Sequence, residues 1–115
     1  MKIRRRHFLH LAASAVALPA VSRLAFAENY PTHPVRIIVG FAAGSTTDIL
    51  ARLMGQWLSQ RLGQQFIIEN RPGAGGNLGA ETVVNSTPDG YTLLMVPPAV
   101  AANAALYPHL GFDFI

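Results

Sequence analysis

Seven consecutive residues at positions 35–41, VRIIVGF, are almost all apolar or β-branched. Their length and composition predict a strand that is buried on both faces of a sheet. A short segment of small and polar residues follows, and from residue 48 the apolar side chains recur at helical spacing as far as residue 62. A fully buried strand that leads into an amphipathic helix favours an α/β fold with parallel strands.

The helix predicted for residues 48–62 has one wide apolar face. Its members are Ile49, Leu50, Leu53, Met54, Trp57, Leu58 and Leu62. The residues that we expect to be buried on the sheet are Ile49, Leu53, Trp57 and Leu58. A polar substitution of Leu53 is then expected to cost several kcal/mol, from lost burial and a cavity. Thr47 or Asp48 is the expected N-terminal cap, and Gly63 is suited to end the helix.

The remaining sequence continues the alternation of strands and helices. Strands are predicted for residues 65–70 and 91–96, and short helices for residues 78–86 and 99–106. Parallel strands place their carboxyl ends at one edge of the sheet, which is where ligands bind in open α/β sheets. The three segments expected at that edge are residues 42–48, 71–77 and 97–103, and we predict that they line one cleft.

The first of these segments, AAGSTTD at residues 42–48, joins a buried strand to a helix N-terminus. Such a terminus has free N–H groups and a partial positive charge, which favour an anion. Gly44 permits close approach of a ligand to the backbone, and three hydroxyl groups add donors. Simple capping by Thr47 and Asp48 is the alternative, and the two roles are compatible.

The second segment is glycine-rich, RPGAGGNLG at residues 71–79, but it does not match a nucleotide-binding motif. A dinucleotide loop requires G-x-G-x-x-G, and counting from Gly73 the last position is Leu78. The sequence has no G-K-S/T motif for a phosphate loop, and no H-x-x-x-H motif or cysteine for a metal site. Ser45 is not in a G-x-S-x-G nucleophile elbow, and the six acidic residues are too scattered to form a carboxylate pair. We therefore expect no cofactor, no metal site and no enzymatic activity.

The first 27 residues have the layout of an export signal. A basic start precedes a mostly apolar stretch at residues 8–21, and Ala25-Phe26-Ala27 suits signal peptidase. The sequence RRHFLH at residues 5–10 resembles the twin-arginine export motif; a Sec signal and a retained anchor are the alternatives. Residues 1–27 carry five basic and no acidic side chains, whereas residues 28–115 carry four and six. Without the signal, the basic patch that nucleic-acid binding requires is missing.

Residues 30–113 resemble the Bug family of extracytoplasmic solute receptors, the substrate-binding components of tripartite tricarboxylate transporters. The matching motifs are YPTHPVRIIV at residues 30–39, GSTTDILAR at 44–52, ENRPGAGGNLGAE at 69–81, PDGYTLL at 88–94 and NAALY at 103–107. ENRPGAGGN followed by PDGYTLL is a specific combination. This sequence departs from the family at Ala42, Ala43 and Thr46, where the family loop usually has a proline and a second glycine.

The resemblance implies a two-lobed, Venus-flytrap binding protein in the periplasm that holds a small carboxylate through backbone amides, hydroxyls and water. Family chains are much longer, so residues 28–115 are expected to be the N-terminal part of the first α/β lobe. The implied partners are the carboxylate, the membrane components of the transporter, the export machinery and signal peptidase. The candidate ligand-binding residues are Ala43, Gly44, Ser45, Thr46, Thr47, Asp48, Asn77, Pro98 and Asn103.

Two other functions are compatible with the sequence. Twin-arginine export often carries proteins that fold around a cofactor, so the chain could be part of an exported enzyme, although it contains no complete cofactor motif. A truncated remnant that binds nothing is the other alternative. In the receptor interpretation, a carboxylate is expected to contact the backbone N–H groups of residues 44–47, with Asp48 turned away from it.

Overall fold

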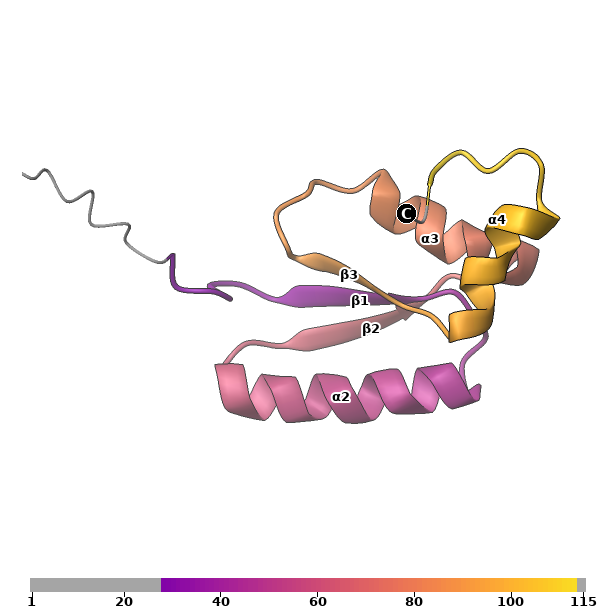
Figure 1. Ribbon diagram of the computed structural model, residues 1–115. Helices are drawn as coiled ribbons and strands as arrows, with labels where there is room; N and C mark the ends of the chain where they lie inside the picture. The colour runs from indigo at the N-terminus through magenta and orange to yellow at the C-terminus, as the bar shows by residue number, and fades with distance from the viewer. Residues whose placement is uncertain (1–27, 114–115) are drawn as a thin grey trace, which may run out of the picture.

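The computed structural model describes residues 28–113, so the predicted export signal lies outside the described residues. Three parallel strands, β1 (Val35–Val39), β2 (Phe66–Asn70) and β3 (Thr92–Met95), form a sheet in the order β2-β1-β3. The helix α2 (Thr46–Leu62) packs on one face of the sheet, and α3 (Asn77–Val84) lies on the other (Figure 1). The predicted α/β class with parallel strands is confirmed. None of the helices in the described range is long and apolar enough to span a membrane.

The last predicted helix, at residues 99–106, is divided into two shorter elements. The 3₁₀ turn η2 (Pro98–Ala102) leads into α4 (Asn103–Leu106), and a second 3₁₀ turn, η1 (Ala74–Gly76), leads into α3. Pro98 starts η2 because proline lacks the N–H group that a first helical residue leaves unbonded. Both short turns lie at the carboxyl end of the sheet, next to the start of α2 (Figure 1).

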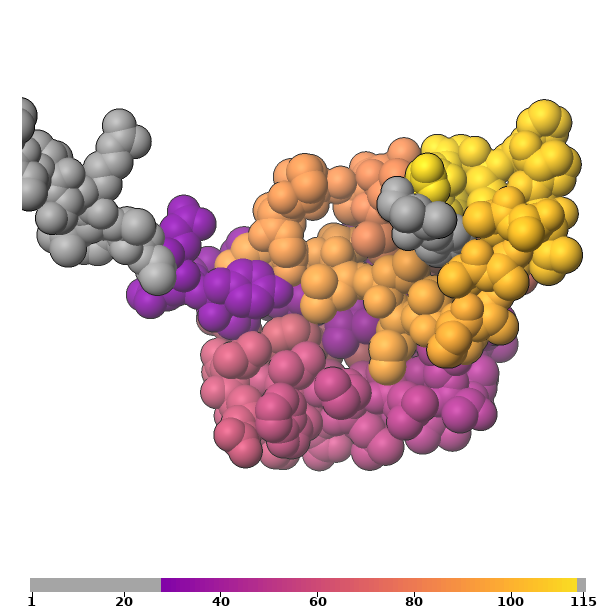
Figure 2. Space-filling view, in the orientation of Figure 1, coloured from indigo at the N-terminus to yellow at the C-terminus, as the bar shows by residue number. Residues whose placement is uncertain are grey.

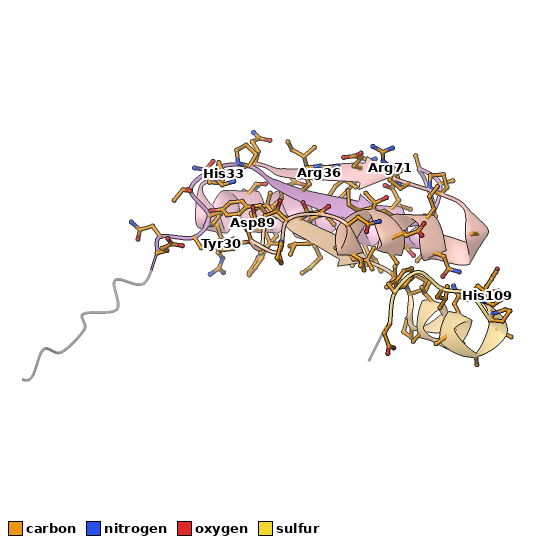
Figure 3. All side chains as sticks on the ribbon, turned by 90° about the horizontal axis from the view of Figure 1, so that it is seen from above. Tyr30, His33, Arg36, Arg71, Asp89 and His109 are labelled. Atoms are coloured by element: carbon orange, nitrogen blue, oxygen red, sulfur yellow. The ribbon has the colours of Figure 1, made fainter. Side chains whose placement is uncertain are left out.

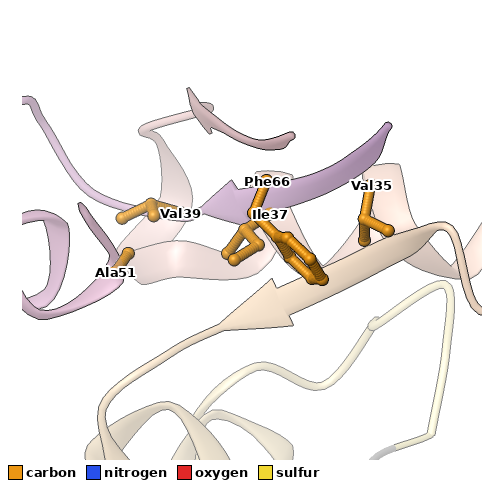
Figure 4. Close-up of a cluster of buried hydrophobic side chains, with 5 residues drawn as sticks. All are labelled: Val35, Ile37, Val39, Ala51 and Phe66. Carbon is orange, nitrogen blue, oxygen red and sulfur yellow. The ribbon is translucent and has the colours of Figure 1, made fainter. Parts of the chain in front are cut away.

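The central strand β1 carries the core. Val35, Ile37 and Val39 point towards α2 and pack with Ala51 and Phe66 (Figure 4). Ile38, on the opposite side of the strand, is also fully buried. Burial on both faces explains the continuous apolar run and confirms the prediction for this strand.

The predicted burial of the α2 apolar face is wrong for most of its members. The side chains of Ile49, Leu53 and Trp57 are 52%, 59% and 50% exposed, and Leu58 is only partly buried. Trp57 is not a core residue; the Arg61 guanidinium lies 4.8 Å from the centre of its ring. The helix therefore has apolar side chains on a second face, which points away from the sheet.

Small residues decide which face of α2 meets the sheet. Its buried positions are Asp48, Ala51 and Gly55. A Cβ atom on Gly55 would lie 3.0 Å from Cδ1 of Ile68 and 3.4 Å from the carbonyl oxygen of Phe66. The backbone of α2 thus approaches β2 more closely than it could if leucines occupied these buried positions.

Because Leu53 faces away from the sheet, we expect Leu53→Ser to change the free energy of unfolding by less than about 1 kcal/mol. This replaces the several kcal/mol expected from the sequence. Urea unfolding followed by circular dichroism measures the change. A loss as large as that of a buried leucine would show that the side chain is enclosed in solution.

Two of the sequence motifs fasten the segment before β1 to the turn before β3. The Tyr30 hydroxyl donates to the Gly90 carbonyl oxygen at 2.6 Å, and the Thr32 N–H donates to the Tyr91 hydroxyl at 2.9 Å. The His33 ring stacks on Tyr91, with 3.6 Å between ring centres. Figure 3 shows Tyr30 and His33 at the amino end of the sheet, near Asp89 of the same turn. YPTHP and PDGYTLL are therefore paired structural elements.

A glycine contact joins the end of β1 to α3. A Cβ atom on Gly79 would lie 2.7 Å from the Gly40 Cα atom, and one on Gly40 would lie 2.9 Å from the Gly76 carbonyl oxygen. The atoms on both sides of this contact belong to the backbone, so neither can move aside as a side chain would. Part of the glycine-rich segment is thus explained by close helix–strand packing.

Candidate ligand-binding site

The three segments predicted to form a site do follow the carboxyl ends of the three strands. The first runs into the first turn of α2, the second contains η1, and the third contains η2 (Figure 1). Because β1 lies between β2 and β3, the segment after β1 is flanked by the other two. Gly76 of the second segment lies close to Val100 of the third and to Phe41, just before the first: a Cβ atom there would lie 3.1 Å from Val100 and 3.2 Å from the Phe41 ring.

Ser45 caps α2, in place of the predicted Thr47 or Asp48. Its backbone is extended, and its Oγ accepts from the Asp48 N–H at 3.2 Å. Thr47 and Asp48 lie inside the first turn, because the helix starts two residues earlier than the sequence predicted. At the other end, Gly63 adopts the left-handed conformation and its N–H donates to the Ser59 carbonyl oxygen, so that prediction is confirmed.

Asp48 holds the first segment in place from inside. Its side chain is buried, and Oδ2 accepts from the Gly44 N–H at 2.9 Å and from Arg52 Nε at 3.0 Å. Oδ1 accepts from Asn70 Nδ2 at 3.0 Å, and the same amide nitrogen donates to the Phe41 carbonyl oxygen at 2.9 Å. The carboxylate thus ties the turn to the end of β2, and its charge is directed away from solvent.

These hydrogen bonds set the acidity of Asp48. The Arg52 guanidinium, the Gly44 N–H and the Asn70 amide together lower the pKa of its carboxyl group from 3.8 to about 2. The charged form is favoured because all three groups donate to it. Asp48 remains an anion at every pH at which the protein is expected to work.

Two backbone donors stay open at the start of α2. The Gly44 N–H, one of the predicted anion contacts, is occupied by Asp48, and the Ser45 N–H donates to the Ala42 carbonyl oxygen at 3.2 Å. Within residues 28–113, the N–H groups of Thr46 and Thr47 have no hydrogen-bond partner. The N-terminus of a helix of 17 residues adds a partial positive charge at this point.

The second and third segments are joined by two buried asparagines. Asn103 Nδ2 donates to Asn77 Oδ1 at 2.7 Å and to the Gly75 carbonyl oxygen at 3.0 Å. Asn77 and Asn103 are 7% and 6% exposed. The structure therefore brings together two residues that the sequence predicted for one site, although they are far apart in the chain.

The other candidate residues lie at the surface of this edge. Ala43, Gly44, Thr46 and Pro98 are exposed, whereas Ser45 and Thr47 are partly buried. Sequence reasoning missed Arg52 and Asn70, which position the first segment through Asp48. Asn70 is the last residue of β2, and Arg52 lies one helical turn after Asp48. Only the i, i+4 spacing of Asp48 and Arg52 was visible in the sequence.

The site offers N–H and hydroxyl donors and no carboxylate directed outward from the first segment. That combination suits a small anion. The part of the chain that the structure describes contains no group of three or more histidine, cysteine, aspartate or glutamate residues arranged to hold a metal ion.

We expect Asp48 to make folding pH-dependent in acid. A carboxyl group whose pKa is lower in the folded state stabilises the fold above its unfolded pKa, and that stabilisation is lost as pH falls. For Asp48 the loss should occur between about pH 4 and pH 2. Unfolding of wild type and Asp48→Asn, measured in urea across this range, tests it. The difference in stability between the two should shrink towards pH 2; a constant difference would contradict the assigned hydrogen bonds.

Residues 50–115 match the family described as "Tripartite tricarboxylate transporter family receptor". The chain belongs to this receptor family. Among curated relatives, a UPF0065 protein of Agrobacterium vitis is 46% identical over 91% of this chain, and protein BugT of Bordetella pertussis is 34% identical over 93%. The alignments include 30% and 32% of those relatives, so this chain spans about a third of their length.

Solved structures of similar proteins share the fold. A Rhodopseudomonas palustris protein solved with adipate is 42% identical, with a TM-score of 0.69, over 73% of this chain and 28% of its own. MatC from the same organism, solved with bound malate, is 40% identical, with a TM-score of 0.69, over 73% of this chain and 29% of its own. The predictions of the family and of a partial periplasmic-binding-protein lobe are confirmed.

Proposed function

We propose that this chain is the N-terminal, ligand-contacting part of an extracytoplasmic receptor for a small dicarboxylate or tricarboxylate. The observation that carries the proposal is the pair of open N–H groups of Thr46 and Thr47 at the start of α2, beside exposed Gly44. The adipate and malate bound to two relatives are both dicarboxylates. A carboxylate at this point gains two hydrogen bonds and the helix dipole.

The candidate residues have different roles in this proposal. The ligand is bound by the N–H groups of Thr46 and Thr47 and by the Ser45 hydroxyl, which can donate while its oxygen accepts from Asp48. Ala43, Gly44 and Pro98 form the exposed rim. Asp48, Asn77 and Asn103 hold the three segments in place and do not need to contact the ligand.

The rest of the functional assignment follows the receptor family. The protein acts in the periplasm after export directed by residues 1–27, with the twin-arginine route favoured by RRHFLH. It delivers the carboxylate to the membrane components of a tripartite transporter and catalyses no reaction.

Calorimetric titration of a grafted receptor tests the proposal. In the graft, the part of MatC that aligns with this chain is replaced by the corresponding residues of this chain. MatC supplies the rest of the receptor fold. Malate, adipate and citrate are titrated, with succinamide as an uncharged control. Binding of at least one acid and not of succinamide is expected; a folded graft that binds none of them would contradict the proposal and favour a remnant without binding activity.

A further inference from the structure

The position proposed for the carboxylate lies next to a negative charge of the protein itself. The three segments at the carboxyl edge of the sheet contain one acidic side chain, that of Asp48, at the end of the molecule where α2 starts and η2 lies (Figure 2). Its Oδ2 accepts from the Gly44 N–H at 2.9 Å, and Gly44 precedes Thr46 by two residues. Because consecutive Cα atoms are about 3.8 Å apart, the carboxylate lies within about 10 Å of the open N–H groups.

A carboxylate at this place opposes the binding of an anion unless its charge is compensated. An acidic side chain in the first turn of a helix interacts with the same partial positive charge that attracts an anionic ligand. Asp48 is buried, so water and salt screen its charge poorly. A unit charge about 10 Å away changes the affinity for an anion about tenfold at an effective dielectric constant of about 20.

The Arg52 guanidinium provides this compensation. Its Nε donates to Asp48 Oδ2 at 3.0 Å, and its Nη2 donates to Asn70 Oδ1 at 3.3 Å. The one basic side chain within the three segments, Arg71, donates to Glu69 Oε1 at 2.8 Å instead. Among residues 28–113, Arg52 is therefore the basic side chain that forms an ion pair with Asp48.

We propose that Arg52 is a specificity-determining residue of the receptor, which allows the start of α2 to bind an anion because it cancels the charge of Asp48. This inference rests on the proposed function and gives Arg52 a role in binding that is separate from folding. Asp48 holds the turn at Gly44 through its hydrogen bonds. Without Arg52 the same aspartate would still hold the turn but would repel the ligand, so Arg52 acts without contacting the ligand.

Calorimetric titration of variants of the grafted receptor with malate, adipate and citrate tests this role. Arg52→Gln removes the charge but keeps an N–H donor for Asp48. We expect it to weaken binding about tenfold in about 0.01 M salt, and the difference from wild type to shrink in about 1 M salt, where the Debye length is about 3 Å. Arg61→Gln, which removes a charge from the last turn of α2, should leave the affinity unchanged.

Two further variants separate charge compensation from a structural role. Asp48→Asn combined with Arg52→Gln removes both charges, so binding should return to within about threefold of wild type. Arg52→Lys, which keeps the positive charge, should also recover the affinity. A purely structural Arg52 predicts that the double variant binds at least as weakly as Arg52→Gln. That result, or wild-type affinity in Arg52→Gln, would overturn the proposal.

A comparison within the Asp48→Asn background does not depend on the folding of Arg52→Gln. Asp48→Asn and the double variant differ only in the Arg52 charge, and neither leaves a buried carboxylate unpaired. Asp48→Asn should bind about tenfold more tightly than the double variant, and equal affinities would contradict the role of Arg52. A folded wild-type graft that binds none of the acids contradicts the proposed function as well. A wild-type graft that binds, with an affinity that is insensitive to Arg52, overturns this inference alone.

Discussion

Replacement of Gly79 by valine is expected to destabilise the chain by about 3 kcal/mol or more, which is a large part of the stability of a domain this small. The first side-chain atom would lie 2.7 Å from the Gly40 Cα atom and 3.1 Å from its nitrogen. Both atoms belong to Gly40, which is buried and directly follows β1, so α3 would have to move away from the sheet. Urea unfolding followed by circular dichroism measures the loss.

Gly44→Ala is the matched control for Gly79→Val. Gly44 has φ +86°, but a Cβ atom there would have no neighbour within 4 Å. Only the left-handed backbone conformation opposes the substitution, at about 1–2 kcal/mol. If Gly79→Val costs no more than Gly44→Ala, the close approach of α3 to β1 is not rigid in solution.

Gly44→Trp in the grafted receptor is expected to weaken carboxylate binding at least 100-fold, about 3 kcal/mol. A Cβ atom at Gly44 would have no neighbour within 4 Å, so the side chain has room there, two residues before Thr46. It would occupy the volume proposed for the ligand. The free energy of unfolding would fall only by the cost of the left-handed backbone conformation at residue 44. Calorimetric titration with malate and adipate measures the affinity.

Gln60→Trp, on the exposed far end of α2, adds the same side chain away from the site. It should leave the affinity unchanged. Wild-type affinity in a folded Gly44→Trp graft would place the carboxylate elsewhere in the receptor.

The order of the three strands and of the two longer helices could be predicted from the amino-acid sequence alone. Burial on both faces produces the apolar run of β1, and the change to helical spacing marks α2, because both patterns arise from local geometry. The same reasoning placed three segments at one edge of the sheet, since parallel strands joined by helices leave no other arrangement. The end of α2 at Gly63 could be predicted as well, because the left-handed conformation that ends a helix depends only on the local residue.

The side of α2 that meets the sheet could not be predicted without the folded structure. The helix carries apolar residues on more than one side, so their spacing does not select a face. Ala51 and Gly55 select it, because their small size lets the backbone approach β2. The contacts of Asp48 with Asn70 and of Asn77 with Asn103 join distant parts of the chain. Such contacts depend on how the strands are paired and how closely the helices pack, and no local pattern encodes that.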